Sequence, residues 1–344
     1  MAARVMITLN DLAGAGLWPP VFGREAPLEL EIGFGWDPFL LEEAARRPDT
    51  DFVGLEYDRQ RVQAFARKAA ARGIPNVRVV HGEALYCLPR LFAPGQLRRT
   101  CIHFPDPWHK KRQQKHRLLG PWFLKVLFHH TAPGGSLVVG TDSEAYRDFI
   151  AESLGAVQGL DNLGAPAAWA DRLPGHPLTK FERLFRSQGK PIFYFHYARG
   201  EAFAKAHGLE VEAARAKIPR RITEMPHMVF TEKLGLADFY AGFQPWEWRE
   251  EEVICKVTEA WLASRGSSLL LEAVLIQEGH DELFYVEISA KDKGTVVRIS
   301  PLREVERNEL LFRFLAGLTK RLQAAFPQAT LSYHNLGNYL QSER

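Results

Sequence analysis

The sequence predicts an α/β protein with a mostly parallel sheet, extended by a smaller C-terminal domain of the α+β class. Two observations lead to this prediction. Between residues 28 and 140, short apolar runs alternate with longer amphipathic stretches, the pattern of parallel strands joined by covering helices. After residue 246, several strand-like runs follow one another before a single long helix. A chain of 344 residues is also long enough for two domains.

The elements of the first domain are predicted in order along the chain. Apolar runs indicate five strands, at residues 28–32, 52–55, 77–80, 101–104 and 136–139. Helical patterns indicate helices at residues 38–46, 58–71, 118–130 and 143–154. The first of these has a clear start, because Asp37 can cap it and Pro38 fits the first helical position. A short helix at residues 179–186 and an aromatic strand at 191–197 are expected to complete the domain.

The rest of the chain is of a different kind. Strands are expected at residues 268–277, 283–289 and 295–299, followed by a helix at 305–326 that Pro327 ends. We therefore expect four parts: an N-terminal segment (1–27), the first domain (28–200), a Pro-interrupted connector (201–245) and an α+β extension of unknown role (246–344).

Composition is that of a soluble enzyme, with 46% hydrophobic and 25% charged residues and no apolar run near the roughly 20 residues that a membrane span needs. The N-terminus lacks a signal-peptide core. The three cysteines are Cys87, Cys101 and Cys255, too few and too scattered for a disulfide framework or a zinc site. We expect a cytoplasmic protein that binds neither a membrane nor a metal; no oligomeric state follows from the sequence.

Charge is unevenly distributed along the chain. Residues 1–200 hold 26 Lys and Arg against 20 Asp and Glu, a net charge of +6, whereas residues 201–344 hold 18 against 21, a net charge of −3. A polyanionic partner would therefore meet mainly the first part of the chain, although a merely basic surface would have the same composition.

A glycine motif stands where the first strand turns into the first helix. Gly33 and Gly35 allow the backbone to approach a cofactor closely at the usual cofactor cleft of a doubly wound fold. Pro38 occupies the place of the third glycine of a dinucleotide fingerprint, which disfavours a nicotinamide dehydrogenase. Glu56, at the end of the second strand, can hold a ribose diol, and Glu31 can contact the amino-acid end of a cofactor or remain a solvated carboxylate.

Two prolines bracket Asp106 in the segment FPDPWHKKR, which follows the fourth strand. They restrict the backbone on both sides and fix one carboxylate at the mouth of the sheet, which favours a catalytic role. Trp108 suits either base stacking or core packing. Beyond it lies a dense basic run suited to phosphates, comprising Lys110, Lys111, Arg112, Lys115 and Arg117.

Two further segments lie near the same expected edge of the sheet. Asp142 ends the fifth strand, beside the ends that carry Glu56 and Asp106. Thr179 and Glu182 are three residues apart and share one face of a helical turn, which a capping box would equally explain.

The segments LEIGFG, GLEYD, GEA, FPDPWHKKR, TD and TKFE, in this order, resemble the bacterial tRNA (guanine-N7-)-methyltransferase family over residues 28–199. The resemblance implies a Rossmann-like class I methyltransferase fold, S-adenosylmethionine as cofactor, and methylation of tRNA at N7 of a guanosine in the variable loop, at tRNA position 46. It implies a cofactor site formed by Glu31, Gly33, Gly35, Glu56, Glu83 and Asp106. It implies guanosine contacts by Lys110, Asp142, Thr179, Lys180, Phe181 and Glu182, and RNA contacts by Lys111, Arg112, Lys115 and Arg117.

Three positions depart from the family pattern. Asp37 stands where a third glycine is usual, Glu83 where an aspartate or asparagine is typical, and His109 in place of a proline. All proposed catalytic groups remain. Other readings stay open: a methyltransferase for another RNA position or a small molecule, and a noncatalytic RNA-binding protein.

The expected mechanism is direct in-line transfer of the sulfonium methyl group to guanine N7, which carries a lone pair and needs no deprotonation. Catalysis would then rest on positioning and electrostatics. The Asp106 carboxylate would stabilise the positive charge that develops on the guanine ring or accept its N1 proton.

Overall fold

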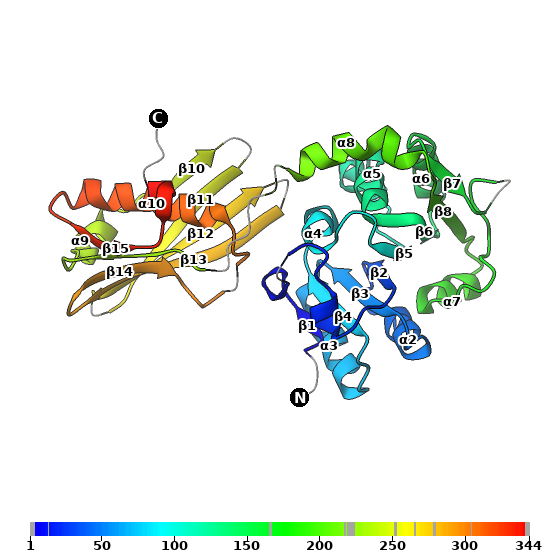
Figure 1. The fold of residues 1–344 in the computed structure, drawn as a ribbon, viewed down its shortest axis with the longest axis horizontal. Coiled ribbons are helices and arrows are strands. Elements are labelled where there is room, and N and C mark those ends of the chain that lie inside the picture. Colours follow the sequence, from blue (N-terminus) through cyan, green and yellow to red (C-terminus); the bar gives the residue numbers. More distant parts are fainter. Residues whose placement is uncertain are drawn as a thin grey trace. The chain divides into compact units, whose positions relative to one another are not determined.

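The computed structural model describes residues 4–12, 14–164, 167–216, 218, 224–250, 253–264, 266–277, 280–303 and 305–340. The chain forms two compact units, Met1–Lys217 and Ile218–Arg344. Figure 1 shows the first unit as a sheet between helices and the second as a sheet carrying one long helix.

The first unit is built on an eight-stranded sheet with the order β1-β4-β3-β2-β5-β6-β8-β7. Its strands are β1 (Met6–Ile7), β2 (Leu28–Ile32), β3 (Asp51–Glu56), β4 (Val77–His81), β5 (Leu97–His103), β6 (Thr131–Thr141), β7 (Leu160–Asn162) and β8 (Phe193–Arg199). Strands β1 to β6 run in one direction, and β8 runs antiparallel to both of its neighbours, β6 and β7. All five predicted parallel strands are confirmed, and the register brings their carboxyl ends to one edge.

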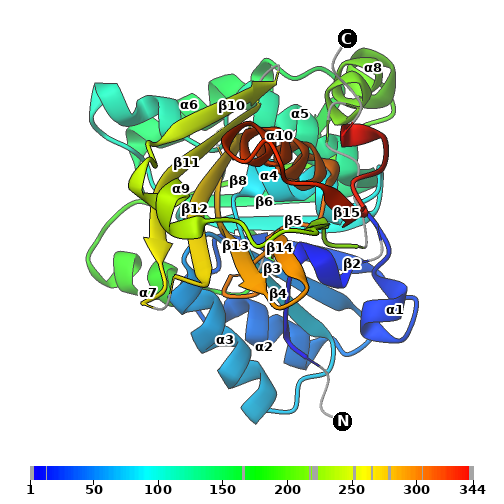
Figure 2. The ribbon, with the colours of Figure 1, turned by 90° about the vertical axis from the view of Figure 1, so that its left-hand side faces the viewer.

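Helices cover both faces of this sheet (Figures 1 and 2). One face is covered by α2 (Phe39–Arg46), α3 (Arg59–Ala71) and α7 (Lys180–Ser187), whose apolar residues share cores with β3 to β6 and β8. The other is covered by α4 (Ala84–Leu91), α5 (Pro121–His130), α6 (Glu144–Gly155) and α8 (Phe203–Arg215), which share one large core. The predicted Rossmann-like doubly wound fold is confirmed.

A buried ion network fixes α2 to the strands. The carboxylates of Glu29 on β2 and Glu43 on α2 are almost fully buried. The Arg99 guanidinium of β5 donates to both, at 3.0 Å to Glu29 Oε2 and 2.9 Å to Glu43 Oε2, and Arg47 contacts the same two groups. Buried charges are tolerated only when paired in this way, so the network sets the position of the helix that follows the glycine motif.

The unit boundaries differ from those expected from sequence. The N-terminal segment is part of the first unit: β1 pairs with β4, and Trp18, next to α1 (Pro19–Phe22), is buried with its Nε1 donating to Leu91 O at 2.9 Å. The predicted connector is not a separate region. Its start forms α8, which packs on α5, while its later part contributes β9 (His227–Phe230) and α9 (Leu236–Ala241) to the second unit. Pro219, one of the prolines that were expected to interrupt the connector, lies outside the described residues.

The second unit is a seven-stranded antiparallel sheet with the order β10-β11-β12-β13-β14-β9-β15. Besides β9, its strands are β10 (Trp246–Glu250), β11 (Val253–Leu262), β12 (Ser268–Gln277), β13 (His280–Lys291), β14 (Gly294–Ile299) and β15 (Leu331–His334). Helix α10 (Glu309–Ala325) lies across one face and buries an apolar stripe against it (Figure 2). The three predicted strands and the long helix are confirmed. No helix among the described residues is long and apolar enough to cross a membrane.

A pair of truncated chains tests where the first unit ends. Phe203 and Val211 of α8 are fully buried in the large core. Removing them should cost about 3–6 kcal/mol, because full burial of each side chain contributes about 1.5–3 kcal/mol. The free energy of unfolding in urea should therefore be several kcal/mol higher for a chain that ends at residue 217 than for a chain that ends at residue 200. Equal free energies of unfolding would show that α8 is a dispensable connector.

Candidate active site

Two adjoining cavities open at the carboxyl edge of the parallel sheet, where β2, β3, β4, β5 and β6 end. The smaller has a volume of about 330 Å³ and the larger about 710 Å³. They have Gly33 and Asp106 in common. The edge predicted to hold the ligands is thus hollowed at the point where the glycine motif meets the FPDPW segment.

The glycine motif is held open by a carboxylate from the next strand. Gly33 and Gly35 adopt φ values of 73° and 54°, which side chains rarely tolerate. The Gly35 amide donates to Glu56 Oε2 at 2.9 Å, and the Asp58 amide donates to Glu56 Oε1 at 3.0 Å. Glu56 is buried in the wall of the smaller cavity, so one carboxylate shapes two loops and retains lone pairs for a ligand.

Asp37 stands where the family pattern has a third glycine, and its carboxylate accepts hydrogen bonds from backbone amides of two helices. Its Oδ1 accepts from the Phe39 amide at 3.0 Å at the start of α2. Its Oδ2 accepts from the amides of Lys180 and Phe181, at 2.7 and 3.3 Å, at the start of α7. One buried carboxylate therefore caps two helices that are distant in sequence and ties the glycine motif to the TKFE segment.

Glu31 and His103 line the larger cavity and begin a series of hydrogen-bonded polar groups that ends at the half-buried His176. Glu31 Oε1 lies 2.8 Å from His103 Nδ1, and His103 Nε2 lies 2.9 Å from His176 Nε2. Burial, with neighbouring carboxylates, raises the pKa of Glu31 well above its usual value, and burial lowers the pKa of His103 to about 4. Glu31 Oε2 is buried without a hydrogen-bond partner among the described residues.

The loop that carries Asp106 is strained and braced. Phe104 and Trp108, on either side of the Pro-Asp-Pro segment, adopt φ values of 50° and 47°, which are unfavourable for bulky residues. The Phe104 amide donates to Gly140 O at 2.7 Å, and Arg117 Nε donates to Pro107 O at 3.0 Å. Surrounding contacts thus impose the conformation that exposes the Asp106 carboxylate to both cavities.

The smaller cavity is completed by Glu83, Tyr57 and Trp108. Burial and the nearby Glu56 carboxylate raise the pKa of Glu83, and burial and the Asp106 carboxylate raise that of Tyr57. Trp108 is half-buried with its ring 5.5 Å from that of His116, so it belongs to the cavity wall rather than to a hydrophobic core.

The far wall of the larger cavity combines aromatic and charged groups. Asp142, at the start of the loop after β6, pairs with Lys190 Nζ at 3.2 Å. Lys190 also lies 4.4 Å from the centre of the Phe185 ring, and the Phe181 ring is exposed at the cavity. Sequence reasoning missed Lys190, which follows α7 and has no local signal of its own.

Several predicted substrate residues do not line the cavities. Thr179 caps α7 by accepting from the Glu182 amide at 3.0 Å, and buried Glu182 accepts from Tyr194 Oη at 2.5 Å and from Arg186. One of the two hydrogen bonds of the capping box that the sequence allowed, from the Glu182 amide to the Thr179 side chain, is therefore present. Lys180 and Lys110 are exposed outside the cavity walls, although His109 lies within one.

The basic run forms a short 3-10 helix, η2 (Lys111–His116), beside the smaller cavity. Lys111, Arg112 and Lys115 are exposed and have no carboxylate partner in the part of the chain that the structure describes. Arg117 differs from these three residues: its guanidinium packs over the rings of Tyr146 and Phe149, at 5.3 and 5.1 Å, and its Nε donates to Pro107 O. Its guanidinium therefore braces the loop that carries Asp106.

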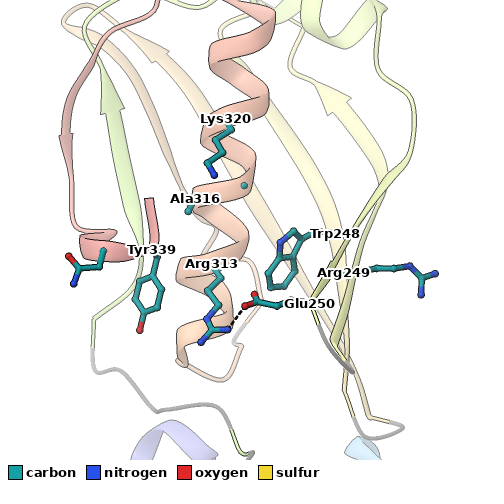
Figure 3. A pocket seen from close by; sticks show the side chains of 9 residues that line it. Trp248, Arg249, Glu250, Arg313, Ala316, Lys320 and Tyr339 are labelled. Carbon is teal, nitrogen blue, oxygen red and sulfur yellow. Dashed lines mark hydrogen bonds and ion pairs between the residues drawn. The ribbon is translucent and has the colours of Figure 1, made fainter. Parts of the chain in front are cut away.

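The second unit has a cavity of its own, of about 550 Å³, between β10, α10 and η3 (Gly337–Leu340) (Figure 3). Trp248 and Glu250 of β10 point towards α10, where Arg313 donates to Glu250 at 2.5 Å and also contacts Glu309. None of the predicted site residues lines this cavity.

Asp37→Ala tests the link between the two motifs. Loss of the caps should lower the free energy of unfolding by about 1–3 kcal/mol, since a helix cap contributes about 0.5–2 kcal/mol. Hydrogen exchange should show loss of protection at the Lys180 and Phe181 amides. Asp58→Ala, which uncaps α3 alone, is the control: stability should fall while these two amides stay protected. Unchanged exchange at both amides in Asp37→Ala would contradict the capping role.

Comparisons with known proteins cover the unit that holds these cavities. Residues 25–195 match the family described as "Putative methyltransferase". The tRNA (guanine-N(7)-)-methyltransferase of Pseudomonas putida (strain W619) is 41% identical over 173 residues, which are 50% of this chain and 72% of that protein. That of Geobacter metallireducens is 34% identical over 190 residues, 55% of this chain and 90% of that protein.

Among solved structures, the 16S rRNA methyltransferase KamB matches 53% of this chain and 92% of its own, with 17% identity and a TM-score of 0.41. That likeness is too low to bear on function. The curated relatives, by contrast, exceed 30% identity over more than two thirds of their length. This chain therefore belongs to the tRNA (guanine-N(7)-)-methyltransferase family.

Proposed function

We propose that this chain transfers the methyl group of S-adenosylmethionine to N7 of a guanosine in tRNA, at position 46 of the variable loop. The observation that carries the proposal is the place of Asp106, which stands at the meeting point of two cavities. One cavity is lined by the cofactor motifs of the family, and the other reaches the TD and TKFE segments. A carboxylate at such a junction lies beside both a cofactor and a substrate base.

The residues present fit this cofactor. S-adenosylmethionine is cationic at its sulfonium and its ammonium groups, and Glu31, Glu56, Glu83 and Asp106 place carboxylates along the two cavities. The unpartnered Glu31 Oε2 suits the ammonium group, Glu56 the ribose hydroxyls, and the region of Glu83 the adenine. When bound, the cofactor supplies an electrophilic methyl group on sulfur.

The larger cavity suits a guanine base. Phe181 offers an exposed ring for stacking, while Asp142 and Lys190 supply an acceptor and a donor. Guanine N7 already has a lone pair, so the protein need only hold the base in line and stabilise the charge that develops on its ring. Asp106 is the carboxylate best placed for this task, because Asp142 already pairs with Lys190.

The exposed cations of η2 support an RNA substrate over a small molecule. Lys111, Arg112 and Lys115 stand beside the smaller cavity and suit phosphates rather than an isolated nucleoside. A methyltransferase for another RNA position would use the same features, and the position of the product distinguishes the two. Glu31, Gly33, Gly35 and Asp106 are all in place at the cavities, which argues against a noncatalytic RNA-binding protein.

The direct test incubates the protein with unmodified tRNA and methyl-labelled S-adenosylmethionine and maps the product by chemical cleavage at 7-methylguanine. We expect one cleavage site, in the variable loop. Label at another base position would indicate the alternative RNA methyltransferase, and tRNA binding without label would indicate the noncatalytic protein.

Asp106→Asn should lower kcat by about a hundredfold or more while tRNA affinity changes little. The substitution keeps the size of the side chain and removes the charge, and one preorganised electrostatic contact typically contributes a few kcal/mol to the transition state. Asp148→Asn, at an exposed aspartate of α6 outside both cavities, is the matched control and should be neutral. Single-turnover rates measure the effect; a near-normal rate in Asp106→Asn would remove Asp106 from the reaction.

Replacing Lys111, Arg112 and Lys115 together by alanine should weaken binding of every tRNA and flatten its salt dependence. Each lost phosphate contact should reduce the slope of log K against log salt by about 0.7–0.9. Arg117 is left in place because it braces the Asp106 loop. Replacing Arg67 and Lys68 of α3 together with Arg72, which follows its last residue, removes three exposed cations away from η2 and controls for charge alone. Equal slopes for the two triple variants would show that η2 makes no special contact.

A further inference from the structure

A hydrogen-bonded histidine pair beside Glu31, His103 and His176, is not explained by the family motifs. His103 ends β5 immediately before the FPDPW segment, and His176 lies in the loop that leads to α7. His103 is buried, His176 is half-buried, and both rings pack against Phe39, at ring-centre distances of 4.4 and 5.3 Å. Apolar residues would fill this space at less cost than two imidazoles, since buried polar groups are unfavourable unless their hydrogen bonds serve them.

The hydrogen bonds among Glu31, His103 and His176 permit only one arrangement of their protons when Glu31 is ionised. An ionised carboxylate can only accept, so His103 must donate from Nδ1. Neutral His103 then has a bare Nε2, which must accept the proton that His176 carries on its own Nε2. Burial favours neutral rings, lowering the pKa of His176 to about 3. The two histidines thus hold Oε1 of Glu31 and leave Oε2 as the oxygen without a partner.

We propose that His103 and His176 are positioning residues that hold the Glu31 carboxylate for the ammonium group of the cofactor. The inference rests on the proposed function, because it takes S-adenosylmethionine as the ligand of the cavities. It adds two residues that do not touch the cofactor and act through Glu31.

The hydrogen-bonded series of Glu31, His103 and His176 also joins the cofactor side of the site to the substrate side. The His176 ring packs edge-on against Tyr194 at 5.6 Å, and Tyr194 donates to Glu182 of α7. Asp37 ties the start of the same helix to the glycine motif. The loop that carries His176 is therefore held between Glu31 and α7, and a displaced His176 would disturb both.

Two probes separate the amino-acid end of the ligand from its nucleoside. S-adenosylhomocysteine carries the ammonium group, whereas 5′-methylthioadenosine lacks the whole amino-acid part. In calorimetric titration of the full chain, His103→Leu should weaken S-adenosylhomocysteine binding by about ten- to a hundredfold, the effect of losing one hydrogen bond to a charged group. Binding of 5′-methylthioadenosine should change less than about twofold.

Conservative variants test the donor itself. His103→Asn keeps a donor near the position of Nδ1, and His176→Gln keeps one near Nε2, so each should retain most of the affinity that the leucine variant at the same position loses. His130→Leu is the control for removing a buried histidine, because His130 is fully buried on α5 and lines neither cavity. It should leave both affinities unchanged.

The outcomes are distinct. If the unaltered protein binds neither probe, the proposed function fails, and this inference fails with it. Suppose instead that the unaltered protein binds both probes. If folded His103→Leu then binds S-adenosylhomocysteine normally, or loses affinity for both probes equally, only the positioning role of His103 and His176 is overturned. Nitrogen NMR of the unaltered protein with S-adenosylhomocysteine needs no variant: we expect protons on His103 Nδ1 and His176 Nε2. The opposite tautomer of His103 would refute the proposal.

Discussion

The site depends on two carboxylates, Glu56 and Asp37, that are held chiefly by backbone amides. Glu56 accepts from the Gly35 and Asp58 amides, and Asp37 accepts from amides at the starts of α2 and α7. An amide satisfies a carboxylate oxygen without cancelling its charge. The carboxyl edge of the sheet therefore combines ordered loops with residual negative charge, and a cationic ligand is the natural complement of such an edge.

Among the residues that the structure describes, non-glycine residues with positive φ occur only in the loop that carries Asp106. Phe104 and Trp108 hold unfavourable backbone angles on either side of Asp106. The ordered sheet supplies one anchor through Gly140 O, and α6 supplies another through the rings that hold Arg117. Such a strained backbone persists only when the contacts around it hold it in place. The basic run therefore has two roles, with its exposed cations facing outward and its last residue serving as a brace.

Local patterns predicted the elements but not the long-range contacts. The apolar runs identified the five parallel strands because buried parallel strands are continuously apolar. They missed α4, which contains Pro89, and α8, whose Gly208 weakens its helical pattern. The motifs placed Glu31, Glu56 and Asp106 at the right edge. They could not reveal that Asp37 binds amides 143 residues away, nor that His176 reaches His103, because no local rule fixes such contacts.

We expect this carboxylate edge to receive S-adenosylmethionine with its amino-acid end at Glu31 and its ribose at Glu56. A crystal structure of the full chain with S-adenosylhomocysteine tests it most directly. We predict the ligand ammonium within hydrogen-bonding distance of Glu31 Oε2, and the ribose hydroxyls within hydrogen-bonding distance of Glu56. A ligand bound in the reverse direction, or outside these two cavities, would contradict it.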